Sequence, residues 1–236
     1  MSTINGGWRG PNIVKDGLVL YLDASSRTSY SSLFSPTTWK DISGLSNNGT
    51  LINGPTFDSA NGGSIVFDGS NDNIDCGPAS FLTSSLTGLT VNAWVYSTNS
   101  RIAIIAENGT NSTTNTFYLA QETVNYFTFQ VCGTTTNDLV YTNFIYQTNT
   151  WYNLVGVWSP NNRVEIYSNG VLSSGLRANS AQTSLINGNR NLFLGIRPAS
   201  SVPFQGRIAY FSIYNRALSA TEITQNYNAT RTRFGL

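Results

Sequence analysis

The chain contains no histidine among its 236 residues. A Ser-His-Asp or Cys-His catalytic device needs an imidazole, and so does a metal site built on histidine nitrogens. Its glutamates, such as Glu107, Glu122 and Glu165, are isolated along the sequence. Glycoside hydrolysis uses two carboxylates held about 5–10 Å apart. The sequence therefore predicts a protein that is not an enzyme.

Oxygen-bearing side chains in two loops could serve a hard cation. Calcium takes several carboxylate and carbonyl oxygens, and Asp41, Asn47, Asp68 and Asp72 could supply some of them. Their spacing is not that of an EF-hand loop. The alternative is that these aspartates accept hydrogen bonds from the backbone of their own turns. Calcium at Asp41, Asp68 and Asp72 is the one cofactor that the sequence allows, and turn capping competes with it.

Aromatic side chains in irregular segments could bind a sugar, because sugar recognition uses a ring to stack on and amide or hydroxyl groups to hydrogen-bond. Tyr30, Phe34 and Trp39 lie in such a segment and are the predicted ligand-binding residues. The competing interpretation packs them between sheets or between subunits. Three tryptophans of strand-like segments are expected in the core or in cross-strand pairs: Trp94, Trp151 and Trp158.

The C-terminal tail combines two cations with an aromatic ring: Arg231, Arg233 and Phe234. Such a tail could dock onto an acidic partner surface. The alternative is a frayed, solvated terminus, and the sequence favours neither interpretation over the other.

Composition limits the partners. Charged residues make up 11% of the chain and aromatic residues 12%, and the formal net charge is +1. A disordered chain would carry more charge and fewer aromatic residues. A net charge this small provides no field for nucleic acid or an anionic membrane. No apolar run approaches the ~20 residues that cross a bilayer, and the N-terminus lacks the order of a signal peptide. We therefore expect no membrane insertion and synthesis in a cytoplasm.

The elements that must position these residues are strands. Period-2 alternation and β-branched or aromatic runs recur along the chain, separated by turn signals. This density of short strands predicts an all-β fold, a two-sheet antiparallel sandwich of jelly-roll type. The strand candidates are 18–22, 64–68, 89–96, 101–107, 116–120, 126–132, 139–146, 151–158, 163–167, 192–196 and 207–214.

Two local signals are specific. Asn169-Gly170 between two strand-like segments predicts a tight hairpin, since both residues tolerate positive φ. Ser219 followed by Glu222 forms a capping box, and Leu218 with Ile223 forms the matching hydrophobic staple. They predict one short helix from Ala220 to about Tyr227.

Domain organisation is predicted to be simple. No repeat, linker or composition break divides the chain, so residues 17–236 are expected to form one domain, preceded by an extended arm at 1–16. Cys76 and Cys132 lie in different strand-like segments. Two buried free thiols are the favoured interpretation, and a single bridge is the alternative.

Ordered blocks of the sequence resemble the laminin-G-like, concanavalin A-like jelly rolls, from about Asp16 to Tyr227. The blocks are 39–44, 47–51, 64–72, 89–95, 151–155, 164–170, 204–208 and 213–219. The resemblance implies the same sandwich. It also implies a structural calcium in many members, although Ala209 stands where many relatives carry an aspartate after Gly-x-Ile. Related glucanases place their acids as Glu-x-Asp-x-x-Glu on one strand, a cluster that this sequence lacks, so a glycoside hydrolase is only a remote alternative.

The flanking segments 12–24 and 226–236 resemble virion proteins of tailed bacteriophages, especially marine and cyanobacterial ones. That resemblance implies a structural protein of the virion, displayed on the head as a decoration protein. Its expected partners are other capsid or tail proteins and copies of itself, in a closed homo-oligomer such as a trimer.

The rival hypothesis is a host-adhesion module that binds a cell-surface glycan. Fold alone does not choose between the two, because function depends on the site that the fold carries.

Overall fold

The structure is a computed structural model. It describes residues 12–31, 37–82, 86–109, 116–122, 125–133, 137–161, 163–178, 183–186, 190–196 and 202–236.

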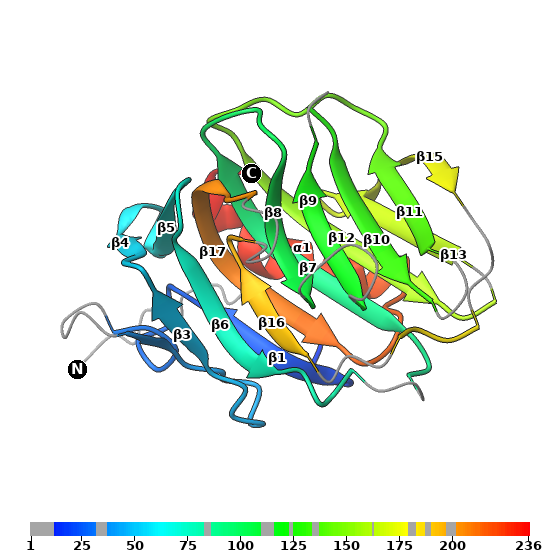
Figure 1. The fold of residues 1–236 in the computed structure, drawn as a ribbon, viewed down its shortest axis with the longest axis horizontal. Coiled ribbons are helices and arrows are strands. Elements are labelled where there is room, and N and C mark those ends of the chain that lie inside the picture. The colour runs from blue at the N-terminus through cyan, green and yellow to red at the C-terminus, as the bar shows by residue number, and fades with distance from the viewer. Residues whose placement is uncertain are drawn as a thin grey trace, which may run out of the picture.

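Two antiparallel sheets form a sandwich (Figure 1), which confirms the predicted fold class. The first sheet has the order β14 (Val171–Leu172), β13 (Arg163–Ser168), β12 (Trp151–Ser159), β7 (Leu89–Ser97), β17 (Gln205–Tyr214), β5 (Ser64–Asp68) and β4 (Thr56–Asp58), with β1 (Leu18–Asp23) also paired to β17. The second sheet has the order β15 (Ser174–Ala178), β11 (Asn137–Thr142), β10 (Phe127–Cys132), β9 (Phe117–Gln121), β8 (Ala103–Asn108), β16 (Asn191–Leu194), β6 (Asn73–Pro78), β3 (Gly49–Ile52) and β2 (Thr38–Trp39).

Strand β17 organises the first sheet. One of its edges pairs with β7 along most of its length. Its other edge pairs with β5 near Gln205–Ile208 and with β1 near Tyr210–Tyr214. The N-terminal strand and the last strand of the chain are therefore neighbours.

The core between the sheets follows from alternation along the strands. Leu89, Val91, Ala93 and Val95 of β7 all point into it and are fully buried. Trp94 lies between Ala93 and Val95, so its side chain points to the outer face of the sheet, and it is also buried. Strand β7 is therefore buried on both faces, which requires a cover on the outside of the sheet.

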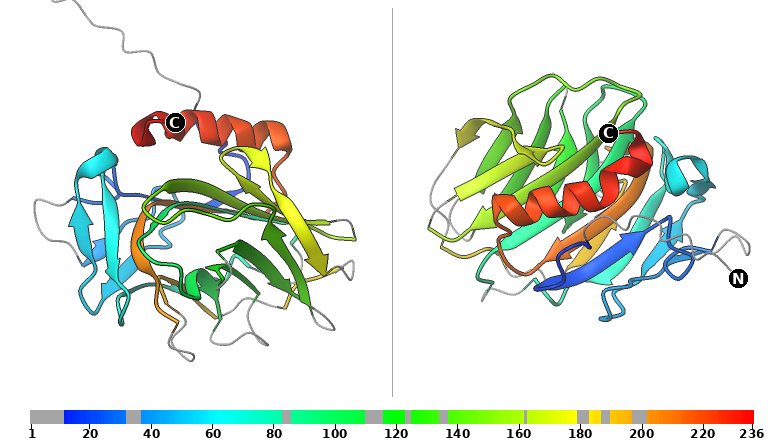
Figure 2. Two further views of the ribbon diagram at one scale, coloured as in Figure 1. Left: turned by 90° about the horizontal axis from the view of Figure 1, so that it is seen from above. Right: turned by 180° about the vertical axis from the view of Figure 1, so that it is seen from behind.

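Helix α1 (Ala220–Thr230) supplies that cover. It lies across the outer face of the first sheet (Figure 2), where Ile223 and Leu218 pack with Val155 and Val157 of β12. The predicted capping box is confirmed: the Ser219 hydroxyl accepts from the Glu222 N–H, and the Glu222 carboxylate accepts from the Ser219 N–H. The helix runs three residues past the predicted end. No helix in the described part of the chain is long and apolar enough to cross a membrane.

The C-terminal tail is folded back onto the domain. Phe234 is buried and stacks on Trp94 with ring centroids 4.0 Å apart, and it packs at a tilt against Trp151 at 4.7 Å. Arg233 donates to the Asp23 carboxylate at 2.9 Å and to two backbone carbonyls, those of Asn61 and Gly63. The predicted docking role of Arg233 and Phe234 is therefore wrong, because their binding groups are used within the chain.

Arg231 also contacts its own chain. Its guanidinium donates to the Asn228 side chain at 2.9 Å and lies over the Tyr227 ring. A short 3₁₀ helix spans Arg231–Phe234, so the alternative of a frayed terminus is wrong as well. The tail lies inward because the Phe234 ring packs against Trp94 and Trp151 on the outer face of the first sheet.

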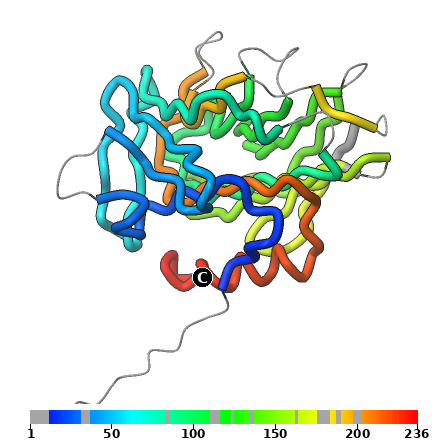
Figure 3. Tube along the Cα trace, turned by 90° about the horizontal axis from the view of Figure 1, so that it is seen from below, coloured from blue at the N-terminus to red at the C-terminus, as the bar shows by residue number. Residues whose placement is uncertain are grey.

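The start of the described chain is tied to the same helix. The Val14 N–H donates to the Asn226 side chain at 2.8 Å, and Val14 O accepts from the Tyr214 hydroxyl. Residues 12–16 of the predicted arm therefore pack on the domain. Residues 1–11 lie outside the described residues (Figure 3).

Most predicted strands are confirmed within a few residues, and one is wrong at its end. The strand expected at 139–146 starts earlier and stops at Thr142. After it the chain leaves the sheet, and the ring of Phe144 stacks on Tyr152 of β12 instead. Strands β2, β3, β4 and β15 were not predicted, because they are short or lack clear alternation.

Neither Cys76 nor Cys132 forms a disulfide, and the two lie in different strands, so the alternative of a single bridge is wrong and the predicted burial holds for one of the two thiols. Cys132 of β10 is buried, and Cys76 of β6 is half-buried. Burial raises the pKa of the Cys76 thiol.

We predict that Phe234→Ala lowers the free energy of unfolding by about 3 kcal/mol, because it leaves a cavity against Trp94 and Trp151. Urea denaturation followed by circular dichroism measures this change. Leu236→Ala is the matched control, since Leu236 is 40% exposed and should change stability little. Equal midpoints for the two variants would contradict the packed tail.

We predict a pH-dependent contribution from the helix cap. Hydrogen bonds from Arg216 lower the pKa of Glu222 from 4.5 to about 2. A carboxyl whose pKa is lowered by folding stabilises the fold above its ordinary pKa, and that contribution is lost as the pH falls from about 4.5 to about 2. Glu222→Gln should therefore be less stable than the wild type at pH 7 and equal to it near pH 2 in urea denaturation. A gap that persists at pH 2 would contradict this assignment.

Candidate functional site

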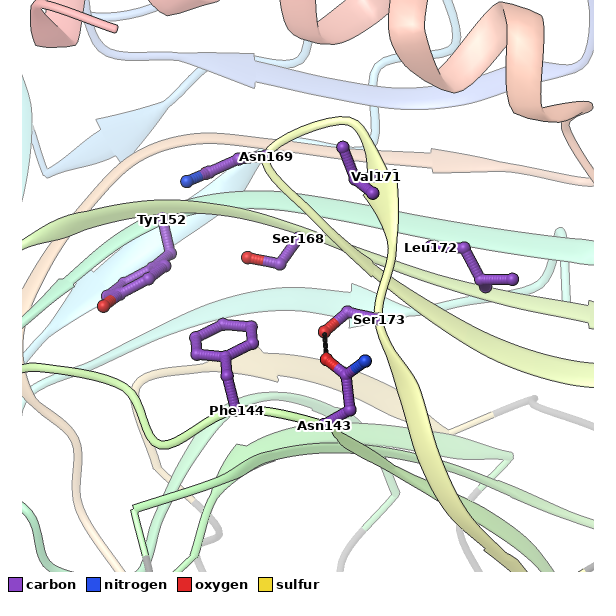
Figure 4. A pocket seen from close by; sticks show the side chains of 8 residues that line it. All are labelled: Asn143, Phe144, Tyr152, Ser168, Asn169, Val171, Leu172 and Ser173. Carbon is purple, nitrogen blue, oxygen red and sulfur yellow. Dashed lines mark hydrogen bonds between the residues drawn. The ribbon is translucent and has the colours of Figure 1, made fainter.

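An open pocket of about 350 Å³ lies at one edge of the sandwich (Figure 4). We call it the hairpin pocket, because the β13–β14 hairpin forms one wall. The loop that follows β11 and the start of β12 form the other. The lining residues are Asn143, Phe144, Tyr152, Ser168, Asn169, Val171, Leu172 and Ser173.

The aromatic part of the hairpin pocket is anchored in the core. Phe144 and Tyr152 stack with centroids 5.6 Å apart, and Tyr152 packs edge-on against Phe127 at 5.4 Å. Phe127 in turn stacks on the buried Tyr146 at 4.3 Å. The Tyr152 hydroxyl accepts from the Gln147 N–H at 3.0 Å. The two rings are therefore held in place without a ligand.

The hairpin wall is built by the predicted Asn169-Gly170 turn, which is confirmed. Both residues have positive φ, 51° and 78°, and the two-residue loop joins Ser168 directly to its partner Val171. Asn169 Oδ1 accepts from the Asn153 N–H at 2.9 Å. The carbonyl of Gly170 accepts from the Thr224 hydroxyl of α1 at 3.3 Å, so the helix supports the turn.

The polar groups of the hairpin pocket are hydrogen-bond donors. Asn143 Oδ1 accepts from the Ser173 hydroxyl at 2.8 Å, and Asn169 Oδ1 is bonded to β12. These bonds fix the amide orientations. Within the described chain, the Nδ2 groups of Asn143 and Asn169 and the Ser168 hydroxyl have no partner. A ligand with oxygen acceptors and an apolar face would match this set.

Exposed apolar side chains gather at the rim. The described chain has six large hydrophobic residues that are exposed: Leu45, Ile102, Ile145, Val171, Leu172 and Leu236. Val171 and Leu172 line the hairpin pocket, and Ile145 follows Phe144 in the sequence. Exposed apolar groups concentrated at one place mark an interaction site more strongly than scattered ones do.

The predicted aromatic platform is not formed. Trp39 is fully buried in the core between the sheets, and Tyr30 is buried and stacks on Phe57 at 5.2 Å. Neither ring offers a free face, so the prediction of ligand contact at Tyr30 and Trp39 is wrong and the intersheet alternative holds. Phe34 lies outside the described residues. The tryptophans at 94, 151 and 158 are buried, as expected.

The predicted calcium ligands bind backbone instead. Asp41 accepts from the N–H groups of Tyr21, Ser43 and Asn47 and from the Ser43 hydroxyl. Asp68 accepts from the Ser70 N–H, and Asp72 accepts from the Asp68 N–H. Burial raises the pKa of Asp72.

These carboxylates also do not gather. In the described ranges, no group of three or more acidic, cysteine or histidine side chains could hold a metal ion. The grouping of Asp41, Asp68 and Asp72 around one calcium is therefore wrong, and each residue has the turn-capping contacts of the alternative.

The Asn169-Gly170 turn of the hairpin pocket is predictable from its residue types, but the pocket is not, because the strand expected at 139–146 includes Phe144. A detectable signal was the polar pair Asn143 and Gln147 around Phe144, which is unusual for a buried strand and typical of an aromatic residue in a loop.

We predict that Asn169→Ala costs about 1–2 kcal/mol of stability, because alanine resists positive φ and removes the acceptor for the Asn153 N–H. Asn169→Asp keeps both properties and should unfold within about 0.5 kcal/mol of the wild type. Thermal and urea denaturation of the two variants measure the difference. If both variants were equally destabilised, the turn would not depend on the carbonyl oxygen of Asn169.

Solved structures resemble this fold. The binding domain of botulinum neurotoxin serotype G superposes with a TM-score of 0.67 at 16% identity, over 89% of this chain and 50% of that chain. The serotype D ligand binding domain in complex with N-acetylneuraminic acid has a TM-score of 0.67 at 15% identity, over 91% and 51%. Trypanosoma rangeli sialidase in complex with the inhibitor DANA has a TM-score of 0.65 at 14% identity, over 92% and 33%.

At these identities the likeness shows the fold alone. The chain spans about half the length of the neurotoxin domains and a third of the sialidase. A comparison with curated proteins found no match.

A family match covers most of the sandwich and the first residues of the helix. Residues 68–224 match Laminin_G_3, described as the concanavalin A-like lectin/glucanases superfamily. The match includes every residue of the hairpin pocket and more than half of the chain. The chain therefore belongs to the Laminin_G_3 family of concanavalin A-like lectins and glucanases.

Proposed function

We propose that this domain is a carbohydrate-binding module without enzymatic activity, and that the hairpin pocket is its ligand site. One observation carries the proposal: two anchored rings, Phe144 and Tyr152, stand beside amide nitrogens of Asn143 and Asn169 that have no partner in the described chain. Rings stack on the C–H face of a sugar, and amides donate to its oxygens.

The size and state of the hairpin pocket fit such a ligand. A volume of about 350 Å³ lies at the lower end of the range for small-molecule sites, which suits one or two sugar units. The rings and the turn are fixed before binding, so little ordering opposes association. The superfamily includes lectins, and the solved neurotoxin neighbours are named as binding domains, which supports a binding role.

The remote alternative is a glycoside hydrolase. None of the eight lining residues is an acid, and several described carboxylates are paired with arginines: Asp23 with Arg233, Asp58 with Arg207, and Glu222 with Arg216. General acid catalysis needs a free carboxyl at the sugar. Release of reducing sugar from polysaccharides, lost on substitution of single acids, would favour the hydrolase.

We further propose that the domain is displayed on a bacteriophage particle, together with other virion proteins and in a homo-oligomer. The resemblance of the flanking segments supports this setting. The hairpin pocket favours the adhesion alternative over head decoration alone, because a purely structural subunit needs no site of this kind. Immunogold labelling of particles would separate label over the head from label at the tail tip.

We predict that the domain binds glycans on an array when it is clustered on a multivalent carrier, which compensates for weak single contacts. Asn169→Asp should reduce the signal at least about 10-fold, because it replaces a donor by an anion at the sugar. Phe144→Ala should cause a similar loss through stacking.

The matched control is Asn161→Asp. Asn161 also has positive φ, 56°, and lies at the opposite end of the β12–β13 hairpin. This control adds the same charge and should leave the signal unchanged. An array that stays silent with the clustered wild type, or a signal that is the same in Asn169→Asp and the wild type, would sink the proposal.

A further inference from the structure

We infer that the hairpin pocket selects neutral pyranoses and rejects sugars that carry a carboxylate. This inference rests on the proposed function and specifies its ligand class. It follows from the chemistry of the lining: two amides, two hydroxyls of serine, two aromatic rings and two aliphatic side chains, with no charged group among the eight described residues.

The acidic residue of β13 that the structure describes is directed away from the hairpin pocket. Alternation along β13 directs Val164 and Ile166 into the core between the sheets, on the side where Ser168 lines the hairpin pocket. Glu165 and Tyr167 therefore point to the outer face, where the Glu165 carboxylate accepts from the Tyr167 hydroxyl at 2.9 Å. The carboxylate of Glu165 is thus directed away from the pocket, and the eight lining residues offer only neutral dipoles.

For an anionic sugar, the free energy lost by desolvation of its carboxylate in the hairpin pocket would exceed the free energy gained from new hydrogen bonds. Moving a carboxylate next to Val171, Leu172 and Phe144 removes part of its hydration, and no guanidinium or ammonium of the lining compensates. Neutral amide donors replace only some of the lost water contacts. A hydroxyl oxygen carries a smaller desolvation cost and accepts from the same Nδ2 groups.

The apolar rim adds a second selection. Phe144 and Tyr152, with Val171 of the hairpin across from them, offer contacts to C–H groups of a sugar ring, whereas the Leu172 side chain points away from the two rings (Figure 4). Val171 is 68% exposed, so a neutral sugar face would bury apolar surface. The inferred ligand differs in charge from N-acetylneuraminic acid, with which the neurotoxin serotype D domain was crystallised.

Matched sugar pairs test the inference. Methyl glucoside and methyl galactoside are each compared with the uronic acid of the same configuration, and N-acetylneuraminic acid is added. Affinities come from shifts of the Asn143 and Asn169 side-chain amide signals in nuclear magnetic resonance titrations of the full chain. We expect at least one neutral sugar to bind about 10-fold more tightly than its uronic acid, and Asn169→Asp, but not Asn161→Asp, to abolish that binding.

A gain-of-charge variant provides an independent check. Val171→Lys places a cation at the exposed rim of an edge strand, where a lysine is well tolerated. It should raise the affinity for the uronic acid several-fold and so reduce the difference in affinity between the neutral sugar and its uronic acid. A variant that leaves this difference unchanged would count against charge as the cause.

The outcomes distinguish a failure of the inference about neutral sugars from a failure of the proposed carbohydrate-binding function. If uronic acids or N-acetylneuraminic acid bind as tightly as every neutral sugar, the inference fails and the carbohydrate-binding function stands. If no sugar of either charge binds to the clustered or the free domain, the function fails and the inference fails with it.

Discussion

The fold depends on one constraint: the central strands of the first sheet are buried on both faces. Strand β7 directs Leu89, Val91, Ala93 and Val95 to one side and Trp94 to the other, and all are buried. A sheet of this kind cannot leave its outer face in water without a large cost in hydrophobic free energy. Helix α1 and the folded-back tail cover that face, and the indole N–H of Trp94 donates to Thr230 at the helix end. The molecule is therefore a sandwich with a third, helical layer, and its C-terminal segment is part of the core.

The same constraint explains where a ligand could bind. Both faces of the first sheet are used for packing, so only its edges and loops remain available. The hairpin pocket lies at one such edge, between a loop that leaves the second sheet and a hairpin that ends the first. Its rings continue the aromatic contacts of the interior, through Phe127 and Tyr146. Interior packing thus gives the pocket its rigidity, and its exposed residues supply the polar groups.

The parts of the fold that are set by neighbouring residues could be predicted from the sequence, and the parts that are set by contacts between distant residues could not. Alternation found β7 and β12, and the Ser219 capping box found the helix start, because these signals need only neighbouring residues. Alternation could not show where β11 ends, since Phe144 leaves the sheet for a contact with Tyr152. The sequence also did not reveal which aromatic side chains are buried. Trp39 and Phe234 lie in segments that look irregular or terminal, yet distant strands bury both of them. The virion setting rests on resemblance of the flanks, to which the fold adds nothing.

The contact between the Asn169-Gly170 turn and α1 links the ligand site to the end of the chain mechanically. A Cβ atom at position 170 would lie 2.9 Å from the Tyr227 ring, and the Gly170 carbonyl accepts from Thr224. The wall of the site thus rests on the helix, and the helix is anchored by the ring of Phe234. A force applied to the C-terminal segment would therefore act on the helix and, through it, on the wall of the proposed site. Adhesion through the proposed site would then depend on the helical layer as well as on the sandwich beneath it.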